Sequence, residues 1–108
     1  MTLAIRHDGM RHEFFADVEG YRPLLQYRCA DRVMSIVHTK VPAPLRKRGI
    51  AAELVRAALA LARAQGWRVD PACSYAREFM DRNAEYADLY ASPAGDDKAN
   101  GPVAGDQN

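Results

Sequence analysis

The sequence has little of what marks several large classes of protein. It contains only two cysteines, Cys29 and Cys73, which lie far apart in the chain, so we expect free thiols rather than a disulfide. No apolar run approaches the roughly 20 residues that a membrane helix needs. The first ten residues also lack the apolar segment of a secretory signal. We therefore expect a cytoplasmic protein that does not enter a membrane.

Charge of one sign and clustered metal ligands are also scarce. The formal net charge is only +1, so no general attraction to nucleic acid or to a membrane surface is expected. The three histidines and two cysteines lack the close spacing of metal ligands, and no metal site is predicted. The hydrophobic content of 48% fits one ordinary globular domain. We predict that this domain covers residues 1–91. Pro, Gly, Asp and Asn dominate residues 92–108, which are predicted to form a disordered tail.

Alternating apolar residues in the first part of the chain predict β-strands. Phe14, Ala16 and Val18 are spaced to lie on one side of a strand, and residues 25–29 also alternate apolar with polar side chains. Residues 33–37 are the most strand-like stretch because they are rich in apolar and β-branched side chains. Together these segments predict an antiparallel meander of three or four strands.

The pattern changes after the prolines at positions 42 and 44, which end the last of these strands. Apolar residues then recur at the spacing of an amphipathic helix, and Gly66 is placed to cap its C-terminal end. The residues predicted to form its buried face are Ile50, Leu54, Ala57, Ala58, Leu61 and Ala64.

A further strand and two shorter helical segments are predicted after this helix. Residues 67–73 are expected to form the strand, with an edge or a bulge at Pro71. Ser74 is placed to cap a second helix, and residues 83–90 offer a last short helical face. Residues 33–73 thus form a βαβ unit, whose short loop directs backbone N–H groups and the positive end of a helix dipole at one point. Such a loop is a ready site for an anion.

The loop before the long helix carries three consecutive basic residues, Arg46, Lys47 and Arg48. Gly49 permits a positive φ and the close approach of a ligand to the backbone, and Ala51 leaves room at the start of the helix. This combination favours a pyrophosphate. The loop matches neither the P-loop nor the Gly-x-Gly-x-x-Gly dinucleotide pattern. Short basic runs are also common on solvated surfaces and on nucleic-acid-binding proteins, so those interpretations stay open.

The residues around this loop resemble a known enzyme family. Arg-x-x-Gly-x-Ala at residues 46–51 is similar to the motif by which GNAT acyltransferases hold the pyrophosphate of coenzyme A. His-Thr-x-Val-Pro precedes it at residues 38–42, and Cys-Ser-Tyr follows at residues 73–75, an order that resembles a small single-domain branch of predicted N-acetyltransferases. The resemblance covers roughly residues 3–90. Family members often carry glycine in place of Lys47, a departure that predicts either a phosphate contact or altered backbone angles.

The resemblance implies an α+β fold of the GNAT type, with a mostly antiparallel mixed sheet of about five strands and two or three helices. It implies an N-acetyltransferase with acetyl-CoA as co-substrate and an amine acceptor, either a small molecule or a protein, that attacks directly. In this family the strand before the loop splays from its neighbour at a bulge. Its backbone N–H groups bind the pantetheine arm and polarise the thioester carbonyl.

Carried over residue by residue, the resemblance implies a cofactor site and two catalytic candidates. The residues expected at the cofactor are Thr39, Lys40, Val41, Arg46, Lys47, Arg48, Gly49, Ile50, Ala51, Tyr75 and Asn83. Cys73 is a candidate nucleophile or a wall of the acetyl pocket. His38 is the candidate general base, because histidine changes its charge near neutral pH.

Each candidate also has a structural interpretation. Cys73 is alternatively a small buried apolar residue, and His38 a strand-end residue with a structural hydrogen bond. Tyr75 is expected either to protonate the departing thiolate or to be a core aromatic. Asn83 either binds the amide arm of the cofactor or caps a helix. For the whole chain, the alternatives are a non-catalytic coenzyme A-binding module, a nucleic-acid-binding domain and a thiol enzyme that pairs Cys73 with His38.

Overall fold

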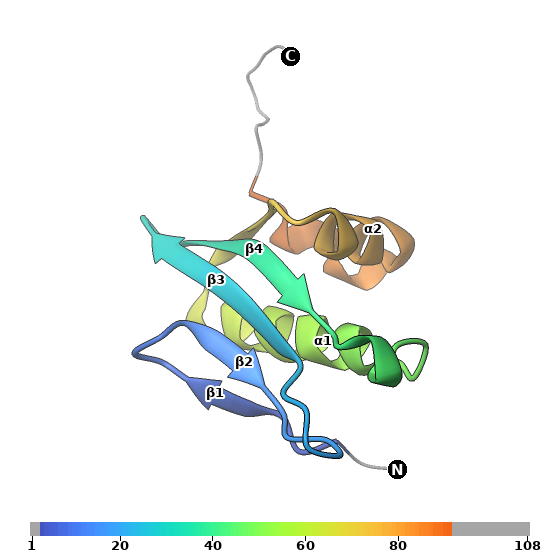
Figure 1. Cartoon of the computed structure of the whole chain (residues 1–108). Coiled ribbons are helices and arrows are strands. Elements are labelled where there is room, and N and C mark those ends of the chain that lie inside the picture. Colours follow the sequence, from blue (N-terminus) through green and yellow to red (C-terminus); the bar gives the residue numbers. More distant parts are fainter. Residues whose placement is uncertain (1–2, 92–108) are drawn as a thin grey trace.

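A computed structural model of the chain describes residues 3–91, and Figure 1 shows its elements. The predicted tail lies outside these residues. The strands are β1 (Arg6–Asp8), β2 (Glu13–Phe15), β3 (Leu24–Ala30), β4 (Val33–Lys40) and β5 (Arg68–Pro71). The helices are α1 (Ile50–Gln65) and α2 (Ser74–Arg82), with short 3-10 helices η1 (Ala43–Leu45) and η2 (Ala84–Leu89).

The strands of the described region form one mixed sheet in the order β1-β2-β3-β4-β5. From β1 to β4 each strand pairs antiparallel with the next, whereas β5 pairs parallel with β4. The α1 helix makes the crossover between the two parallel strands. The predictions of an antiparallel meander, a βαβ unit and a mostly antiparallel mixed sheet in an α+β fold are therefore confirmed.

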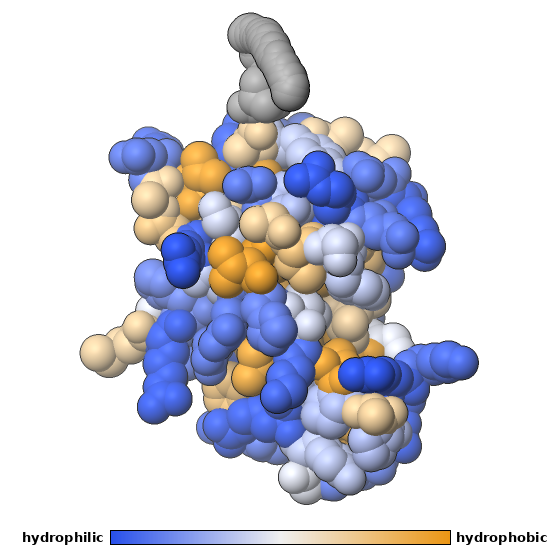
Figure 2. Space-filling model, turned by 45° about the horizontal axis from the view of Figure 1, so that its top comes forward, coloured by the Kyte–Doolittle hydropathy of each residue, from blue (hydrophilic) through white to orange (hydrophobic). Residues whose placement is uncertain are grey.

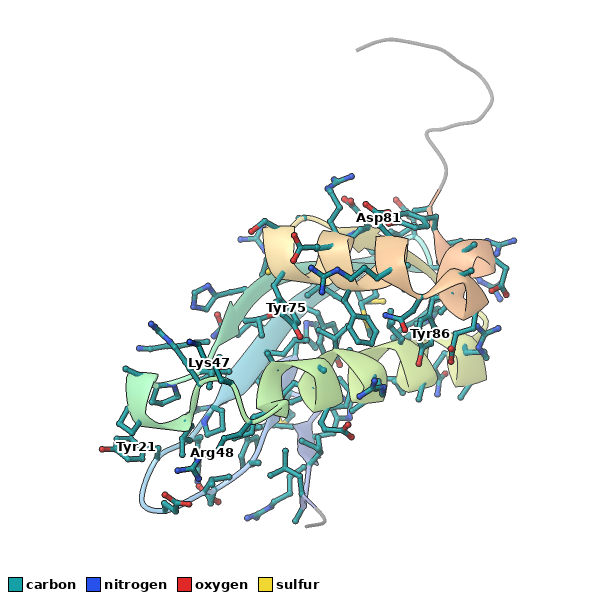
Figure 3. The ribbon with its side chains drawn as sticks, turned by 90° about the vertical axis from the view of Figure 1, so that its right-hand side faces the viewer. Tyr21, Lys47, Arg48, Tyr75, Asp81 and Tyr86 are labelled. Carbon is teal, nitrogen blue, oxygen red and sulfur yellow. The ribbon has the colours of Figure 1, made fainter. Side chains whose placement is uncertain are left out.

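Both α-helices cover the same face of the sheet (Figures 1 and 3). Leu25, Met34 and Ile36 point to that face and are completely buried. Burial alternates along β3 and along the first half of β4, because successive side chains of a strand point to opposite faces. The other face carries half-buried and exposed side chains, and no helix of residues 3–91 covers it.

Glycine ends α1 on both sides. Gly49 precedes the helix with φ 79°, and Gly66 follows it with φ 74°, a left-handed conformation that costs glycine little. The Gly66 N–H donates to the carbonyl groups of Ala62 and Arg63. The predicted C-terminal cap at Gly66 is therefore confirmed.

The predicted buried face of α1 is partly wrong. Ala64 is exposed and Leu61 is only half-buried, whereas Val55, Leu59 and Ala62 are completely buried. The helix packs against the sheet and also against α2 and η2, so the buried stripe is turned away from the predicted one. Alanine and leucine occupy most positions of α1, so its apolar spacing alone does not single out one face.

Two predicted boundaries after α1 are also corrected. The last strand ends at Pro71 rather than at residue 73, although Pro71 does lie on a strand at the end of the sheet. The chain then leaves the strand, and the Cys73 N–H donates to the Ile36 carbonyl at 2.9 Å. Ser74 is the first residue of α2 and not its cap, because Cys73 occupies the N-cap position without a side-chain cap.

One face of the described region is mainly polar. Figure 2 shows hydrophilic residues over most of one face, with apolar patches that are small and separate. Among residues 3–91 no helix combines the length and the apolar character that crossing a membrane requires.

Candidate functional site

A β-bulge interrupts the pairing of β3 with β4. Tyr27 lies opposite Ile36, but the preceding residue of β3, Gln26, lies opposite His38. Val37 is therefore an extra residue in β4. One inserted residue reverses the face to which every later side chain of the strand points.

The bulge divides the end of β4 between the two faces of the sheet. Thr39 lies opposite the buried Leu25 and so returns to the helix-covered face, while His38 lies on the open face. Strand β5 reaches only as far as Ile36 along β4. Residues 37–40 therefore extend past β5 with one backbone edge that no strand of the described region pairs.

A cavity of about 660 Å³ lies between this free end of β4 and the start of α1. Figure 3 shows Tyr75 reaching from α2 toward the N-terminal end of α1, with Lys47 on the loop beside it. The lining residues are His38, Thr39, Lys40, Val41, Leu45, Arg46, Lys47, Gly49, Ile50, Ala51 and Tyr75. All of these except Leu45 were predicted from the sequence. Leu45 is completely buried, and its sequence signal is a single apolar side chain before the basic loop.

The backbone of the loop is left-handed at two positions. Gly49 has φ 79° and Lys47 has φ 66°. This conformation costs a residue other than glycine about 1 to 3 kcal/mol. Lys47 therefore adopts an unfavourable backbone conformation that glycine would adopt with little strain. A Cβ atom built on Gly49 would have no neighbour within 4 Å. The space beside Gly49 is therefore open to a ligand that approaches the backbone.

The first turn of α1 presents amide donors to the cavity. The first intrahelical hydrogen bond runs from Glu53 N–H to the Gly49 carbonyl at 3.2 Å. The amides of Ile50, Ala51 and Ala52 precede that bond and so have no acceptor within the helix. No side chain caps this end of α1. With the helix dipole, these donors suit an anion such as a pyrophosphate.

The three basic residues of the loop separate in space. Arg46 and Lys47 line the cavity, and Arg46 Nε donates to the Val41 carbonyl at 3.1 Å. Arg48 points instead to the turn between β2 and β3 (Figure 3), where its Nη1 lies 2.5 Å from Glu19 Oε2. The hydrogen bond and the charge of Glu19 raise the pKa of Arg48. Arg48 therefore does not line the cavity to which the sequence assigned it, but a neighbouring one.

The two catalytic candidates lie on different sides of the β4 backbone. His38 is exposed and lines the cavity. Cys73 is half-buried, and its Sγ lies 3.7 Å from Thr39 Oγ1, so that Thr39 stands between the thiol and the cavity. Within residues 3–91 the hydrogen-bond partner of the thiol is Thr39 and not His38. The structure therefore does not form the Cys–His pair of the alternative thiol enzyme.

Tyr75 and Asn83 lie at opposite ends of α2. Tyr75 lines the cavity, and burial raises the pKa of its phenol although Arg56 and Arg82 act in the opposite direction. The phenol is therefore protonated at neutral pH and able to donate. The Asn83 amide instead donates to the Phe79 carbonyl at 2.7 Å at the end of the helix. The structure thus shows the helix-end interpretation of Asn83 and places this residue outside the cavity.

The described region contains no cluster of metal-binding side chains. No group of three or more His, Cys, Asp or Glu side chains among residues 3–91 is arranged to hold a metal ion. The polar groups that meet at the cavity are instead amides, cations, a hydroxyl, a phenol and an imidazole. This set can bind a phosphorylated thioester and move protons.

Comparison with known proteins agrees with this arrangement. A family model described as GCN5-related N-acetyl-transferase matches residues 13–89. The chain therefore belongs to the GCN5-related N-acetyltransferase family, as its resemblance to GNAT enzymes implied.

Its relatives include a vertebrate protein. Protein NATD1 of Bos taurus is 32% identical over 84 residues, which cover 75% of this chain and 74% of that protein. Protein NATD1 of Homo sapiens is 30% identical over 84 residues, with 75% and 74% covered. The NMR structure of a Staphylococcus aureus protein described as GCN5-like matches with a TM-score of 0.68 at 24% identity, covering 91% of this chain and 97% of that one. This last similarity confirms the fold.

Proposed function

We propose that this chain is an N-acetyltransferase that binds acetyl-CoA in the cavity between β4 and α1 and transfers the acetyl group to an amine. The observation that carries the proposal is the meeting of two features in one cavity. One is the unpaired backbone edge of residues 37–40, and the other is a basic, uncapped helix N-terminus. Membership of the GCN5-related family supports the same conclusion.

The two features suit different parts of acetyl-CoA. The amides at the start of α1, with Arg46 and Lys47, would hold the pyrophosphate. Residues 39–41 would line the pantetheine arm, whose amides can pair with a free strand edge as another strand would. A backbone N–H at the bulge would then polarise the thioester carbonyl.

The side chains around the cavity supply the proton transfers. The amine nitrogen forms a bond to the thioester carbon, and the carbon–sulfur bond breaks. His38 accepts the proton that the amine loses. Tyr75 donates a proton to the departing thiolate, which it can do because its raised pKa keeps the phenol neutral. Cys73 lies behind Thr39, which lines the cavity, so the thiol supports the wall of the acetyl pocket from outside, and the transfer is direct.

One observation favours a second candidate, a coenzyme A-binding module without catalysis. Among residues 3–91, no Asp or Glu lines the cavity, and a carboxylate is a common general base. The two candidates differ only in turnover, since both require binding at the same loop. An acceptor screen therefore distinguishes them.

The first test combines calorimetric titration with acetyl-CoA and an assay of free thiol release against a panel of amines and lysine peptides. We expect binding, and acetylation of at least one acceptor. His38→Ala should lower kcat about 100-fold, the usual scale for a general base, and leave the Kd for acetyl-CoA unchanged. Cys73→Ala should keep most of the activity. A Cys73→Ala variant without activity would contradict direct transfer, and binding without turnover on any amine would favour the non-catalytic module.

Tyr75→Phe is expected to lower kcat about tenfold at neutral pH through loss of the general acid. In the wild type this contribution is present while the phenol is protonated, and it declines only as the pH rises through a pKa that lies above the usual value of 10.0. The variant should lack that alkaline decline. Tyr86→Phe is the matched control, since Tyr86 lies in η2, where its ring packs near Phe79, and does not line the cavity. Equal losses in both variants would assign Tyr75 a packing role.

A further inference from the structure

Three side chains from neighbouring strands form a row across the open face of the sheet. Glu13 of β2 lies opposite Gln26 of β3, and Gln26 lies opposite His38 of β4. Directly opposed residues on neighbouring antiparallel strands have Cβ atoms about 4.5 to 5.5 Å apart. Gln26 therefore stands between a carboxylate and the imidazole at the edge of the cavity.

The hydrogen bond to Glu13 fixes the orientation of the Gln26 amide. Gln26 Nε2 donates to Glu13 Oε2 at 2.9 Å in a partly buried position. An ionised carboxylate can only accept, so the amide must present its nitrogen to β2. The amide oxygen of Gln26 is consequently left for the other side of β3, where His38 lies. That oxygen is an acceptor suited to an imidazole N–H.

The bulge is what brings His38 into this row. Continued from the pair Tyr27–Ile36, a regular register would place Val37 opposite Gln26 and turn His38 to the helix-covered face. The extra residue exchanges the two positions. Bulges often re-aim a side chain beside an active site, and here the re-aimed side chain is the one imidazole among the residues of the described region that line the cavity.

We propose that Gln26, held by Glu13, orients His38 for proton abstraction. This inference rests on the proposed function, which makes His38 the base. The Gln26 oxygen accepts the N–H of one ring nitrogen, so the other ring nitrogen carries a lone pair. That nitrogen takes the proton that the amine loses as the nitrogen–carbon bond forms. Gln26 and Glu13 touch no reacting atom, so both are positioning residues.

The same row stabilises the product of the proton transfer. In the imidazolium both ring nitrogens are donors, and the one toward β3 still has the Gln26 oxygen on the opposite strand as its acceptor. The negative charge of Glu13 polarises the amide between them and strengthens that bond. Because His38 is exposed, it can afterwards pass the proton to solvent.

Nitrogen NMR of the His38 ring tests the orientation without any substrate. The shifts of the two ring nitrogens report which one carries the proton. We expect one fixed tautomer in the wild type and a mixture in Gln26→Leu. Glu13→Gln, which keeps the shape but frees the amide to turn, is a second variant with the same expected change. Arg28→Leu, on the same face of β3 but opposite Ser35, is the matched control and should behave as the wild type.

Kinetics then test whether the orientation serves catalysis. Gln26→Leu should lower kcat about tenfold, the scale of coupling between interacting residues, with an unchanged KM for acetyl-CoA. In a His38→Ala background Gln26→Leu should have no further effect. The inference would be overturned if the tautomer of His38 stayed the same in both Gln26→Leu and Glu13→Gln. It would also be overturned if the losses of kcat in the His38→Ala/Gln26→Leu double variant were additive. A Gln26-dependent tautomer in a protein that acetylates no amine would overturn the proposed function, and with it the catalytic role inferred for the row.

Discussion

Replacing Leu59 by alanine is expected to lower the free energy of unfolding by about 3 kcal/mol. Leu59 is completely buried on α1, and truncation of a buried leucine both removes apolar contact and leaves a cavity. The total free energy of unfolding of a domain of this size is only about 5 to 15 kcal/mol. The melting temperature should fall by roughly 12 to 24 °C, at about 4 to 8 °C for each kcal/mol.

Leu61→Ala is the matched control for this loss. Leu61 lies on the same helix and is half-buried, so its truncation should cost only about 1 kcal/mol. The helix propensity changes equally in both variants, and urea unfolding monitored by circular dichroism measures the difference. Equal losses, or a larger loss for Leu61, would place the buried face where the apolar spacing alone had suggested.

That comparison marks a limit of sequence-based inference for this fold. Strand β3 was predictable because alternation has a period of two, which few other structures share. Strand β2 ends at Phe15, so Ala16 and Val18 lie beyond the strand to which their spacing assigned them. The C-terminal end of α1 was predictable because Gly66 is a strong stop signal. The rotation of α1 was not, since an alanine- and leucine-rich helix offers several apolar stripes, and the stripe that is buried depends on α2 and η2 packing beside it.

The candidate site also contains residues whose positions were predictable from the sequence and residues whose positions were not. Residues 38–41 and 46–51 are contiguous, so a local motif places most of them together, and the cavity lining contains them with the exception of Arg48. The position of Arg48 depends on Glu19, which is 29 residues away in the sequence. The position of Asn83 depends on which end of α2 faces the cavity. Neither relation is encoded in nearby residues.

The bulge is the least predictable part of the site and the most consequential. Whether His38 or Thr39 points to the open face depends on the register between β3 and β4, which shifts at Val37. A run of mixed polar and apolar residues gives no sign of such a shift. Only the paired strand reveals that Gln26 and His38 share a face, and so that a positioning row exists.

Arg46→Ala/Gly49→Trp is expected to weaken the binding of acetyl-CoA about 1,000-fold, or about 4 kcal/mol. Loss of a charged hydrogen-bond donor accounts for about 1.5 to 3 kcal/mol of this. The indole would fill the open space beside Gly49 and block the approach of the phosphates to the amides of α1. Calorimetric titration measures the change directly.

The same helix supplies a matched control at its other end. Arg63→Ala/Gly66→Trp replaces the same residue types at the same spacing, and Gly66 has a φ of 74° against 79° for Gly49. Both double variants should therefore lose similar stability from forcing a side chain into the left-handed region. Only the first should lose acetyl-CoA, because only Arg46 and Gly49 line the cavity. If both double variants bind acetyl-CoA equally weakly, the loss is due to unfolding. If Arg46→Ala/Gly49→Trp binds as tightly as the wild type, this loop does not bind the pyrophosphate, and the neighbouring cavity beside Arg48 becomes the candidate site.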